Sequence, residues 1–407
     1  MMSKEKRRVP KLRFPGFTED WEQRKLSQIT VRVTRKNGNQ SDLPLTISAQ
    51  DGLVDQRKYF NRQVASRDMT NYYLIKKGEF AYNKSYSEGY PFGAVKRLDY
   101  YDIGALSTLY ILFEITDKNI SSDFLVSYYM THLWYKEVSK RAAEGARNHG
   151  LLNISTEDFF NSELNIPNSI EEQVKIGNLI KQFDKFITLH QRKLNNLKLK
   201  KKALLQKLFP KNEERYPELR FPGFTDAWEQ RKLGSLATVE MNKRIFKEQT
   251  TIKGDIPFYK IGTFGSDADS FISRELFKEY KNKYPYPNIG DILISASGSI
   301  GRTVVYNGED AYYQDSNIVW LNHNGKIDNS FLLQFYNQVK WAGLEGSTIK
   351  RLYNKNILET NIALPKIEEQ RLIGKFFELV DRSITLHQRK LDHLQLQKKA
   401  LLQQMFV

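Results

Sequence analysis

The chain has 407 residues, enough for two to four domains that each bury a core. It contains no Cys, which excludes disulfides, thiolate metal sites and a Cys nucleophile. Its 63 Lys and Arg outweigh 47 Asp and Glu to give a net charge of +16, and it carries 22 Tyr and 24 Phe. Such a composition is typical of nucleic-acid binding, although a solvated basic surface would also produce it.

The chain starts with a charged stretch, residues 1–8, that no apolar run follows. A secretory signal is therefore not expected. No apolar run elsewhere approaches the ~20 residues that cross a bilayer. We expect a cytoplasmic protein.

Two short motifs near the start of the chain occur again in its second half, and we call each pair of motifs a frame. Arg-Phe-Pro-Gly-Phe-Thr at 13–18 and Trp-Glu-Gln-Arg-Lys-Leu at 21–26 return at 220–225 and 228–233. The residues just before each copy, 4–10 and 211–217, are also alike. Because the frame recurs, we expect a cyclic arrangement of two units with the chain ends near each other.

The first insert within the frame, residues 27–160, mixes strand-like runs, turns and short helices. Residues 78–85 and 89–95 read as two strands with a turn between them. An aromatic-rich helix is expected from Phe124 to Tyr135, and a polar loop at 144–149 follows it.

Next, residues Pro167 to Phe209 predict one long helix. Its apolar residues follow a 4-3-4-3 spacing that indicates a heptad seam, interrupted only by His190 and Lys201. Ser169 is expected to cap the helix, with Glu172 completing a capping box, and Pro210 to end it. The basic run at 198–202 is read as an exposed coiled-coil face and not as a DNA contact.

The second insert, residues 234–360, does not visibly match the first in sequence. Gly290 to Ser295 nevertheless predicts a turn into a buried strand, and Gly298 to Tyr306 a turn and a second strand. An aromatic helix at 331–341 and a loop at 345–351 come after them. The order of elements therefore predicts one architecture with different loop chemistry in the two inserts.

The final helix repeats the first, and residues 187–194 return unchanged as 384–391. We expect the two helices to pair antiparallel as a rod of roughly 60 Å; the alternative is that each packs on its own domain. His190 and His387 should then meet near a pseudo-two-fold axis and fix the register. The predicted seam residues are Ile180, Ile187, His190, Leu194, Leu197, Ile384, His387, Leu391 and Leu394.

Signatures of catalysis are missing from the sequence. It has no Gly-x-Gly, no Walker-type phosphate loop and no Asn/Asp-Pro-Pro-Tyr/Phe motif, and its six His form no ligand-spaced cluster. Gly298-Ser299-Ile300-Gly301 resembles an anion-binding loop but joins two strands. We expect a chain without catalysis, metal or cofactor of its own.

The candidate DNA contacts are loop residues with base-edge or phosphate chemistry, since Arg pairs with guanine, Asn with adenine and Lys with phosphate. The alternative is that they are solvated loop ends. They are Lys84, Ser85, Tyr86, Arg147, Asn148, His149, Ser297, Ser299, Arg302, Ser347, Lys350 and Arg351.

These motifs together resemble a known family. The Trp-Glu-Gln-Arg-Lys-Leu entry, the strand at 290–295, the Gly-Ser-Ile-Gly turn and the exit at 363–370 into a long helix look like a target recognition domain. Two in tandem resemble the specificity subunit of a type I restriction–modification enzyme. The chain departs from the family in having one proline at each exit, and the first insert has Glu88 to Gly93 instead of Gly-Ser-Ile-Gly.

The resemblance implies an α+β fold in which two mixed α/β target recognition domains are joined by two long antiparallel coiled-coil helices in a pseudo-two-fold cyclic repeat. The implied domains are residues 1–165 and 211–364, with spacer helices at 166–210 and 365–407.

The implied function is a non-catalytic subunit that reads a bipartite, asymmetric site on double-stranded DNA. The partners implied are two methyltransferase subunits, which carry S-adenosylmethionine, and restriction subunits. Two alternatives are a stand-alone DNA-binding regulator and a coiled-coil assembly protein without a nucleic-acid role.

Overall fold

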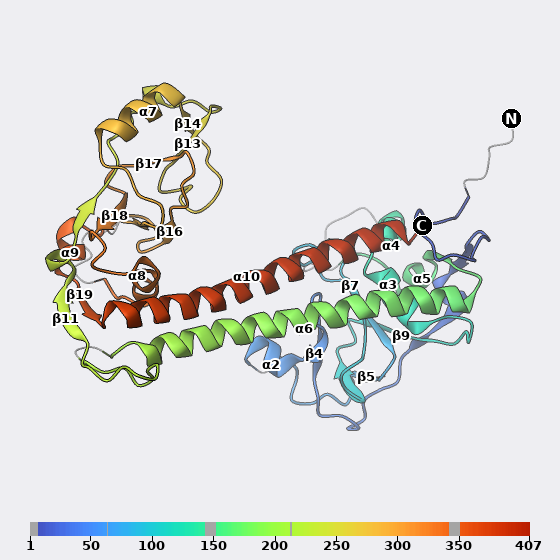
Figure 1. The fold of residues 1–407 in the computed structure, drawn as a ribbon. Helices are drawn as coiled ribbons and strands as arrows, with labels where there is room; N and C mark the ends of the chain where they lie inside the picture. Colours follow the sequence, from blue (N-terminus) through green and yellow to red (C-terminus); the bar gives the residue numbers. More distant parts are fainter. Residues whose placement is uncertain (1–6, 63, 143–151, 212–213, 342–350) are drawn as a thin grey trace. The chain divides into compact units, whose positions relative to one another are not determined.

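The structure is a computed structural model that describes residues 7–62, 64–142, 152–211, 214–341 and 351–407. The chain forms two compact units: unit 1 comprises residues 1–191 with 389–407, and unit 2 comprises residues 192–388. Two long helices, α6 (Ile170–Leu208) and α10 (Ile367–Gln404), each contribute to both units (Figure 1). No helix in the described ranges combines the length and apolar character that a membrane span requires.

Unit 1 is built around a four-stranded antiparallel sheet in the order β2-β9-β6-β7. Two antiparallel pairs, β3 with β4 and β5 with β8, complete the insert. The sheet strands are β2 (Thr30–Val33), β6 (Phe80–Asn83), β7 (Ala94–Arg97) and β9 (Ile111–Ile115). The paired strands are β3 (Leu45–Ser48), β4 (Gly52–Asp55), β5 (Tyr73–Lys76) and β8 (Ile103–Leu106). The helices are α1 (Leu26–Ile29), α2 (Gln56–Phe60), α3 (Ser122–Tyr129), α4 (Leu133–Arg141) and α5 (Thr156–Phe160).

Unit 2 repeats this sheet in the order β12-β18-β15-β16, so the shared architecture predicted for the inserts is confirmed. A smaller sheet, β14-β13-β17, lies within the same insert. Its strands are β12 (Thr238–Glu240), β13 (Ile256–Tyr259), β14 (Phe271–Ile272), β15 (Ile292–Ser295), β16 (Thr303–Val305), β17 (Tyr312–Tyr313) and β18 (Ile318–Asn322). Its helices are η1 (Leu233–Ser235), η2 (Lys247–Gln249), α7 (Arg274–Lys283), α8 (Asn329–Tyr336) and α9 (Asn354–Glu359).

The repeated frame motif closes each insert. Its Glu-Gln-Arg-Lys forms β1 (Glu22–Lys25), which pairs with β10 (Glu163–Ile166), and β11 (Glu229–Lys232), which pairs with β19 (Asn361–Leu364). Each insert therefore begins and ends on one antiparallel ribbon that leads into a long helix.

Buried ion pairs join the frame to the helix starts. Arg13 pairs with both carboxylate oxygens of Glu172, and Arg220 does the same with Glu369. Hydrogen bonding to these carboxylates raises the pKa of both arginines. Ser169 Oγ accepts from Glu172 N at 3.4 Å, as predicted for a cap. A capping box would also have the Glu172 carboxylate accept a hydrogen bond from the Ser169 backbone N–H. In the structure this carboxylate accepts from the Arg13 guanidinium instead.

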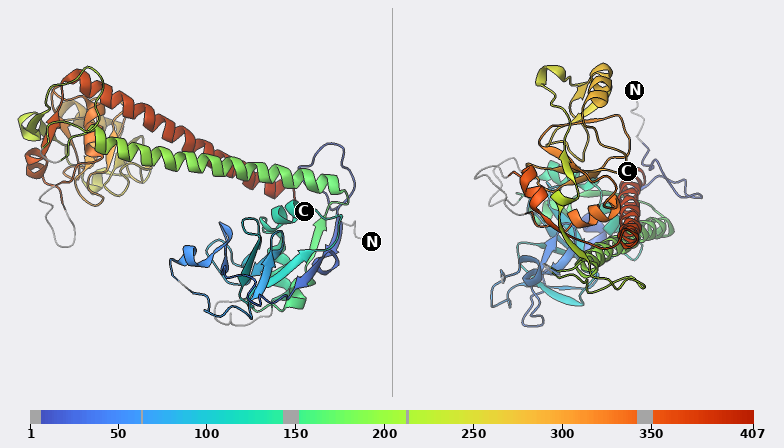
Figure 2. Two further views of the ribbon diagram at one scale, coloured as in Figure 1. Left: turned by 90° about the horizontal axis from the view of Figure 1, so that it is seen from below. Right: turned by 60° about the vertical axis from the view of Figure 1, so that its left-hand side comes forward.

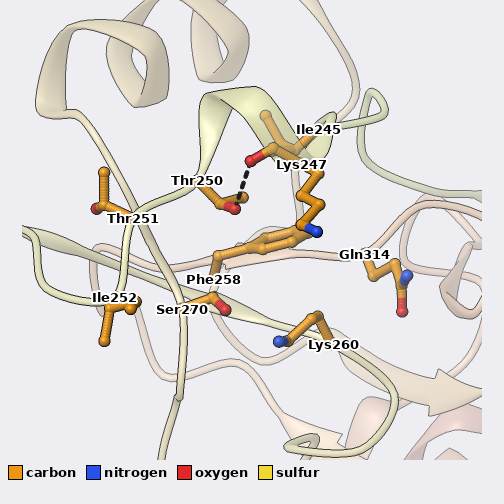
Figure 3. Close-up of a pocket in the computed structure, with 9 residues that line it drawn as sticks. All are labelled: Ile245, Lys247, Thr250, Thr251, Ile252, Phe258, Lys260, Ser270 and Gln314. Carbon is orange, nitrogen blue, oxygen red and sulfur yellow. Dashed lines mark hydrogen bonds between the residues drawn. The ribbon is translucent and has the colours of Figure 1, made fainter.

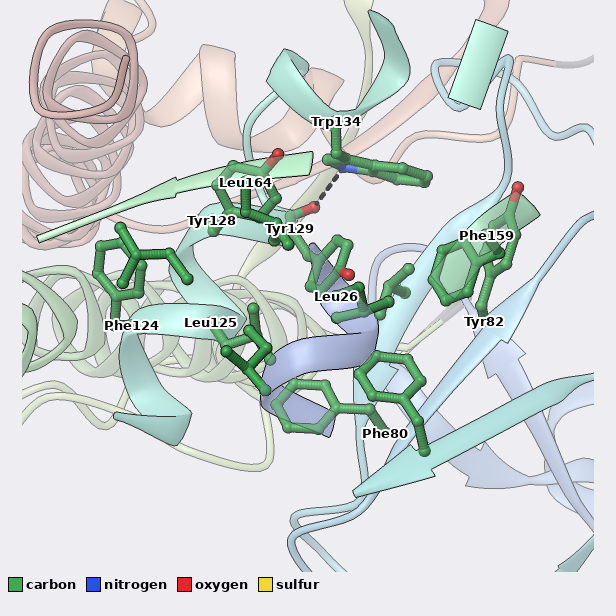
Figure 4. Packing of buried hydrophobic residues seen from close by; sticks show 14 of the residues in the cluster. Leu26, Phe80, Tyr82, Phe124, Leu125, Tyr128, Tyr129, Trp134, Phe159 and Leu164 are labelled. Atoms are coloured by element: carbon green, nitrogen blue, oxygen red, sulfur yellow. Dashed lines mark hydrogen bonds between the residues drawn. The ribbon is translucent and has the colours of Figure 1, made fainter. Parts of the chain in front are cut away.

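The end of one long helix completes the core of the other repeat's domain. In unit 2, Phe209 follows α6 and packs against Trp228 and Phe331. In unit 1, Phe406 follows α10 and packs in the same way against Trp21 and Phe124. The core that receives Phe406 is rich in aromatic residues, and it includes side chains from α1, α3, α4, α5, β6, β9 and β10 (Figure 4).

Within each unit, the parts of α6 and α10 that belong to it run antiparallel, side by side (Figures 1 and 2). In unit 1, Lys398 of α10 contacts Asp184 of α6 at 2.5 Å. In unit 2, Lys201 of α6 contacts Asp381 of α10 at 2.7 Å. Lys201, which interrupts the heptad pattern of α6, and Lys398 at the matching position of α10 therefore each reach an aspartate on the neighbouring helix. This pairing offsets the cost of partly burying their charge.

Side-chain burial along the helices is uneven. Ile180, Leu194, Leu391 and Leu394 are buried. The other predicted seam residues, Ile187, His190, Leu197, Ile384 and His387, are half-buried. The meeting of the two histidines stays a prediction.

Two predicted helices have different limits. The expected helix at 124–135 is wrong as one element, because α3 ends at Tyr129 and α4 begins at Leu133. Thr131 causes the break: its hydroxyl donates to Tyr128 O and accepts from Leu133 N. The expected helix at 331–341 is α8, which starts at Asn329 and stops at Tyr336.

Candidate nucleic-acid interface

Three loops converge at one place in unit 2. The first, 296–301, joins β15 to β16; the second, 260–265, follows β13; the third, 351–353, precedes α9. Leu352 N donates to Ala296 O at 2.8 Å, which ties the third loop to the first. Arg302 Nη1 donates to Phe264 O at 2.7 Å, which ties the first to the second.

Unit 1 builds the same convergence from unrelated residues. Its loop between β6 and β7, residues 84–90, receives a hydrogen bond from Leu152 N at Lys84 O. The turn after β3, residues 49–51, shares with Ser85 and Tyr86 a cavity of about 290 Å³. The "three-loop surface" of each unit is therefore 49–51, 84–90 and 152–155 in unit 1, and 260–265, 296–301 and 351–353 in unit 2.

In unit 2 the structure brings four candidate residues onto or beside this surface. Arg351 is exposed and bridges to Ser297 through the backbone. Ser299 and Arg302 are exposed as well. Ser297 is buried, and its hydroxyl donates to Asn317 Oδ1 at 2.6 Å, so that group supports the loop from beneath. Ser347 and Lys350 lie outside the described residues.

In unit 1 the candidate residues differ in their exposure and in what their groups contact. Lys84 Nζ donates to Ile154 O at 3.3 Å, so the ammonium group helps to join two of the loops. Ser85 N donates to Asn83 Oδ1, which shapes the turn. Tyr86 is 56% exposed and presents its ring on the surface. Arg147, Asn148 and His149 lie outside the described residues.

The turns 49–51 and 260–265 were missed from the sequence. The sequence does contain a feature that could have located them. Asp42-Leu43-Pro44 directly precedes β3, and the similar Asp255-Ile256-Pro257 stands at the start of β13. These similar tripeptides, both Asp-aliphatic-Pro, align the turns that follow, although the turns themselves share little sequence.

Four tyrosines lie in the hydrophobic clusters inside the insert of unit 2. Burial raises the pKa of Tyr286, Tyr306, Tyr312 and Tyr313, so their hydroxyls remain protonated donors. They donate to Ala311 O, Glu309 O, Lys243 O and Glu309 Oε1, respectively. These acceptors lie outside the three loops, but Tyr306 and Tyr313 share a hydrophobic cluster with Phe264 of the turn 260–265 and so support that turn from the inside.

The chemistry of both surfaces is that of hydrogen bonding and charge. Arginines, amides and hydroxyls on loops are suited to base edges and phosphates. Across the described parts of the chain, no group of three or more His, Asp or Glu is placed to hold a metal ion.

Comparison with known protein families gives one match over most of the chain. The model of the type I restriction modification DNA specificity domain matches residues 19–199 and again 225–396.

Two relatives support this match. A Haemophilus influenzae protein, described as a type I restriction enzyme specificity subunit, is 54% identical over 158 residues; the alignment covers 38% of this chain and 41% of that protein. The MjaX specificity subunit of Methanocaldococcus jannaschii is 23% identical over 410 residues, covering 94% of this chain and 92% of that one.

Solved structures share the fold. The S subunit of a type I restriction–modification system from M. genitalium superposes with a TM-score of 0.62 at 16% identity, covering 98% of this chain and 99% of that chain. A chain from a study of assembly and conformational transition of the type I system gives 0.52 at 17% identity, covering 97% and 98%.

Proposed function

The chain belongs to the type I restriction–modification DNA specificity family, and from this membership we propose that it reads a bipartite, asymmetric DNA sequence. Specificity subunits are non-catalytic, so the chain recognises DNA for other subunits. Each unit would read one half-site through its three-loop surface. Membership in this family also disfavours a stand-alone DNA-binding regulator.

One observation carries the proposal: the two units have matching scaffolds but different loops. The sheets β2-β9-β6-β7 and β12-β18-β15-β16 have the same order, and both frames close with the same ribbon. The loops at the end of the sheets differ in length, charge and residue type. Similar scaffolds with different reading loops are what a site with two different halves requires.

The repeated surface of the long helices supports the partner proposal. Leu189 and Leu386 are 60% and 67% exposed, and Leu199 and Leu396 are 65% and 66% exposed. Packing within the chain does not explain why exposed leucines recur at matching positions. We assign these faces to two methyltransferase subunits, which bring S-adenosylmethionine, with restriction subunits joining the complex in the cytoplasm.

The domain limits remain part of this proposal: recognition domains at 1–165 and 211–364, and spacer helices at 166–210 and 365–407. The compact units do not follow these limits, because each contains parts of both helices. We propose that the helices set the gap between half-sites. Adding seven residues to both should change the preferred gap, and an unchanged gap would remove the spacer role.

The decisive test exchanges residues 27–160 for the corresponding insert of another specificity subunit. The chain is co-expressed with its methyltransferase partner, and adenine methylation is mapped across the genome. We expect one half-site to change and the other to be kept. The matched control, exchange of residues 234–360, should change only the other half-site. A change in both halves from either exchange would contradict the proposal.

A further inference from the structure

Besides the cavity of unit 1, the structure has a cavity in unit 2, next to the three-loop surface of that unit. It has a volume of about 520 Å³ and is lined by Ile245, Lys247, Thr250, Thr251, Ile252, Phe258, Lys260, Ser270 and Gln314 (Figure 3). The lining comes from η2 and the residues on either side of it, from β13 and the residue after it, and from the residues just before β14 and just after β17. The segment from 241 to 255 that forms much of it is longer than the matching segment of unit 1, 34 to 44.

The charge of the cavity is positive. Lys247 and Lys260 both line it, and none of the described lining residues is acidic. Lys260 Nζ lies 2.8 Å from Asp269 Oδ1, so part of its charge is balanced from outside the lining. Lys247 is exposed and makes no ion pair with any described residue, which leaves its charge available to a ligand.

The donors of the cavity that remain free are nitrogen groups, because the hydroxyl protons are used within the chain. Thr250 Oγ1 donates to Lys247 O, Thr251 Oγ1 to Lys253 O, and Ser270 Oγ to Asp269 Oδ1. Gln314 Oε1 accepts from Ile261 N at 3.1 Å, and within the described chain no partner is found for the Gln314 Nε2 amide. Two ammonium groups and one amide N–H₂ remain, a set that suits an anion with several oxygens.

The position of the cavity in the fold indicates which anion it binds. Lys260 begins the turn 260–265, and Gln314 holds the next residue, Ile261, through its backbone. A Cβ on Gly298 would lie 3.5 Å from Ile261 Cγ1, so the cavity and the loop 296–301 are in contact through that residue. An anion bound here would therefore lie beside the groups that we assign to base reading.

We propose that this cavity binds a backbone phosphate of the DNA whose bases the three-loop surface of unit 2 reads. The proposal rests on the proposed function. Lys247 and Gln314 contact the phosphate oxygens, Lys260 adds charge, and the phosphate fixes the register of the strand on the loops. The contact contributes affinity without sequence preference.

The test measures how DNA affinity depends on salt. The full chain with its methyltransferase partner is titrated with a duplex that contains the site and with a duplex that lacks it, between about 50 and 200 mM salt. Lys247→Gln removes one cation, and we expect the slope of log affinity against log salt to fall by about 0.9, the value for one phosphate. The ratio of specific to non-specific affinity should stay within twofold.

Two further variants complete the test. Lys253→Gln removes the same charge from an exposed neighbour that does not line the cavity, and its slope should match the parent chain. Gln314→Glu keeps the oxygen that accepts from Ile261 N but replaces the amide donor with a carboxylate, so affinity should fall for every sequence. Equal slopes for Lys247→Gln and the parent, or an equal fall with Lys253→Gln, would overturn the cavity proposal.

A different outcome would count against the proposed function. If the parent complex binds both duplexes equally, sequence reading is refuted, while the comparison of Lys247→Gln with Lys253→Gln still decides the cavity. Binding of inorganic phosphate to the chain without DNA separates the sources of the anion. If Lys247→Gln abolishes millimolar phosphate binding but leaves the salt slope for DNA unchanged, the cavity binds free phosphate, and the assignment to DNA is overturned.

Discussion

At the scale of single residues, two glycines let the long helices lie against their recognition domains. A Cβ on Gly177 of α6 would lie 2.8 Å from Asp123 C, and one on Gly374 of α10 would lie 2.9 Å from Phe331 N. Both neighbours are backbone atoms, which cannot rotate away. Close approach of backbone to backbone explains glycine inside a helix, where it is otherwise unfavourable.

Replacing Gly374 with Ala therefore tests two opposing effects. Helix propensity alone would stabilise the variant by about 1 kcal/mol. Overpacking costs about 1–3 kcal/mol, and we expect it to dominate. The free energy of unfolding, measured by denaturant titration, should fall. Gly262→Ala, where the added Cβ meets no atom within 4 Å, serves as the control. A more stable Gly374→Ala variant would contradict the close packing.

Arg351 is the exposed candidate residue whose backbone joins two reading loops. We expect Arg351→Ala to weaken binding of the specific duplex by about 1–3 kcal/mol, with relaxed preference at one base pair, because a guanidinium pairs with guanine in bidentate geometry. Arg351→Lys should keep the charge and still lose the preference. Equal weakening on all sequences, with a smaller salt slope, would assign Arg351 to a phosphate instead.

The buried tyrosines of unit 2 make stability depend on alkaline pH. Burial raises the pKa of Tyr313 above its ordinary value of about 10, which applies in the unfolded chain. Above about pH 10 the unfolded state loses protons that the folded state keeps, so stability is full below that pH and falls as pH rises. The thermal midpoint should therefore drop between about pH 9 and 11.

A substitution checks this origin. Tyr313→Phe removes one such hydroxyl, so its thermal midpoint should fall less steeply over the same pH range than that of the parent. Tyr216→Phe changes a tyrosine that is 57% exposed and should leave the slope unchanged. Parallel curves for Tyr313→Phe and the parent would show that buried tyrosines do not set the alkaline limit.

At the scale of elements, one ion pair in each unit links α6 to α10. Lys398 lies 17% exposed beside Asp184, which is 40% exposed. Lys96 of β7 packs nearby; burial, and then the positive charge of Lys398, lowers its pKa. Asp184 therefore balances more than one cation at this crossing.

Reversing the charge at Asp184 should accordingly destabilise the crossing. Asp184→Lys places a third cation beside Lys398 and Lys96, and we expect a lower thermal midpoint. Because Asp184 is partly exposed, the pair itself should contribute below about 1 kcal/mol. The double variant Asp184→Lys with Lys398→Asp should recover most of the loss in a double-mutant cycle. No recovery would show that the pair does not couple the helices.

At the scale of the whole molecule, the two repeats join frame and helix through equivalent hydrogen bonds. Leu12 N donates to Gln404 O at 2.9 Å, and Leu219 N donates to Lys207 O at 2.8 Å. Trp21 N likewise donates to Arg8 O, as Trp228 N does to Arg215 O. The C-terminal segment thus meets the first frame as α6 meets the second.

A circular permutant follows from this equivalence. In this permutant Val407 is joined to Lys4, and the chain is opened after Lys211. The new connection from α10 to the first frame then has the same length as the natural connection from α6 to the second frame. We expect the permutant to unfold with the same thermal midpoint as the parent, within a few degrees, and to bind the same DNA. Joining Val407 to Leu12 omits the connecting residues and should prevent the Leu12–Gln404 contact. Loss of a cooperative transition in the first permutant would contradict the cyclic arrangement.

The sequence alone determined the features that depend on neighbours along the chain. Heptad spacing predicted two long helices, the turns at Gly290 and Gly298 with the apolar runs after them predicted β15 and β16, and the repeated frame predicted matching scaffolds. Each of these signals is periodic or repeated, so it can be read without knowing which distant residues meet. The family resemblance was readable for the same reason.

Tertiary structure decided everything that joins distant residues. It placed Phe406 in the core of the first repeat, paired Lys201 with Asp381, and buried Ser297 beneath a loop that the sequence marked as a contact. It also assembled the cavity of Lys247, Lys260 and Gln314 from three separate segments. The physical reason is that burial and hydrogen bonding depend on which loops converge, and loops with little shared sequence give no local pattern to align them.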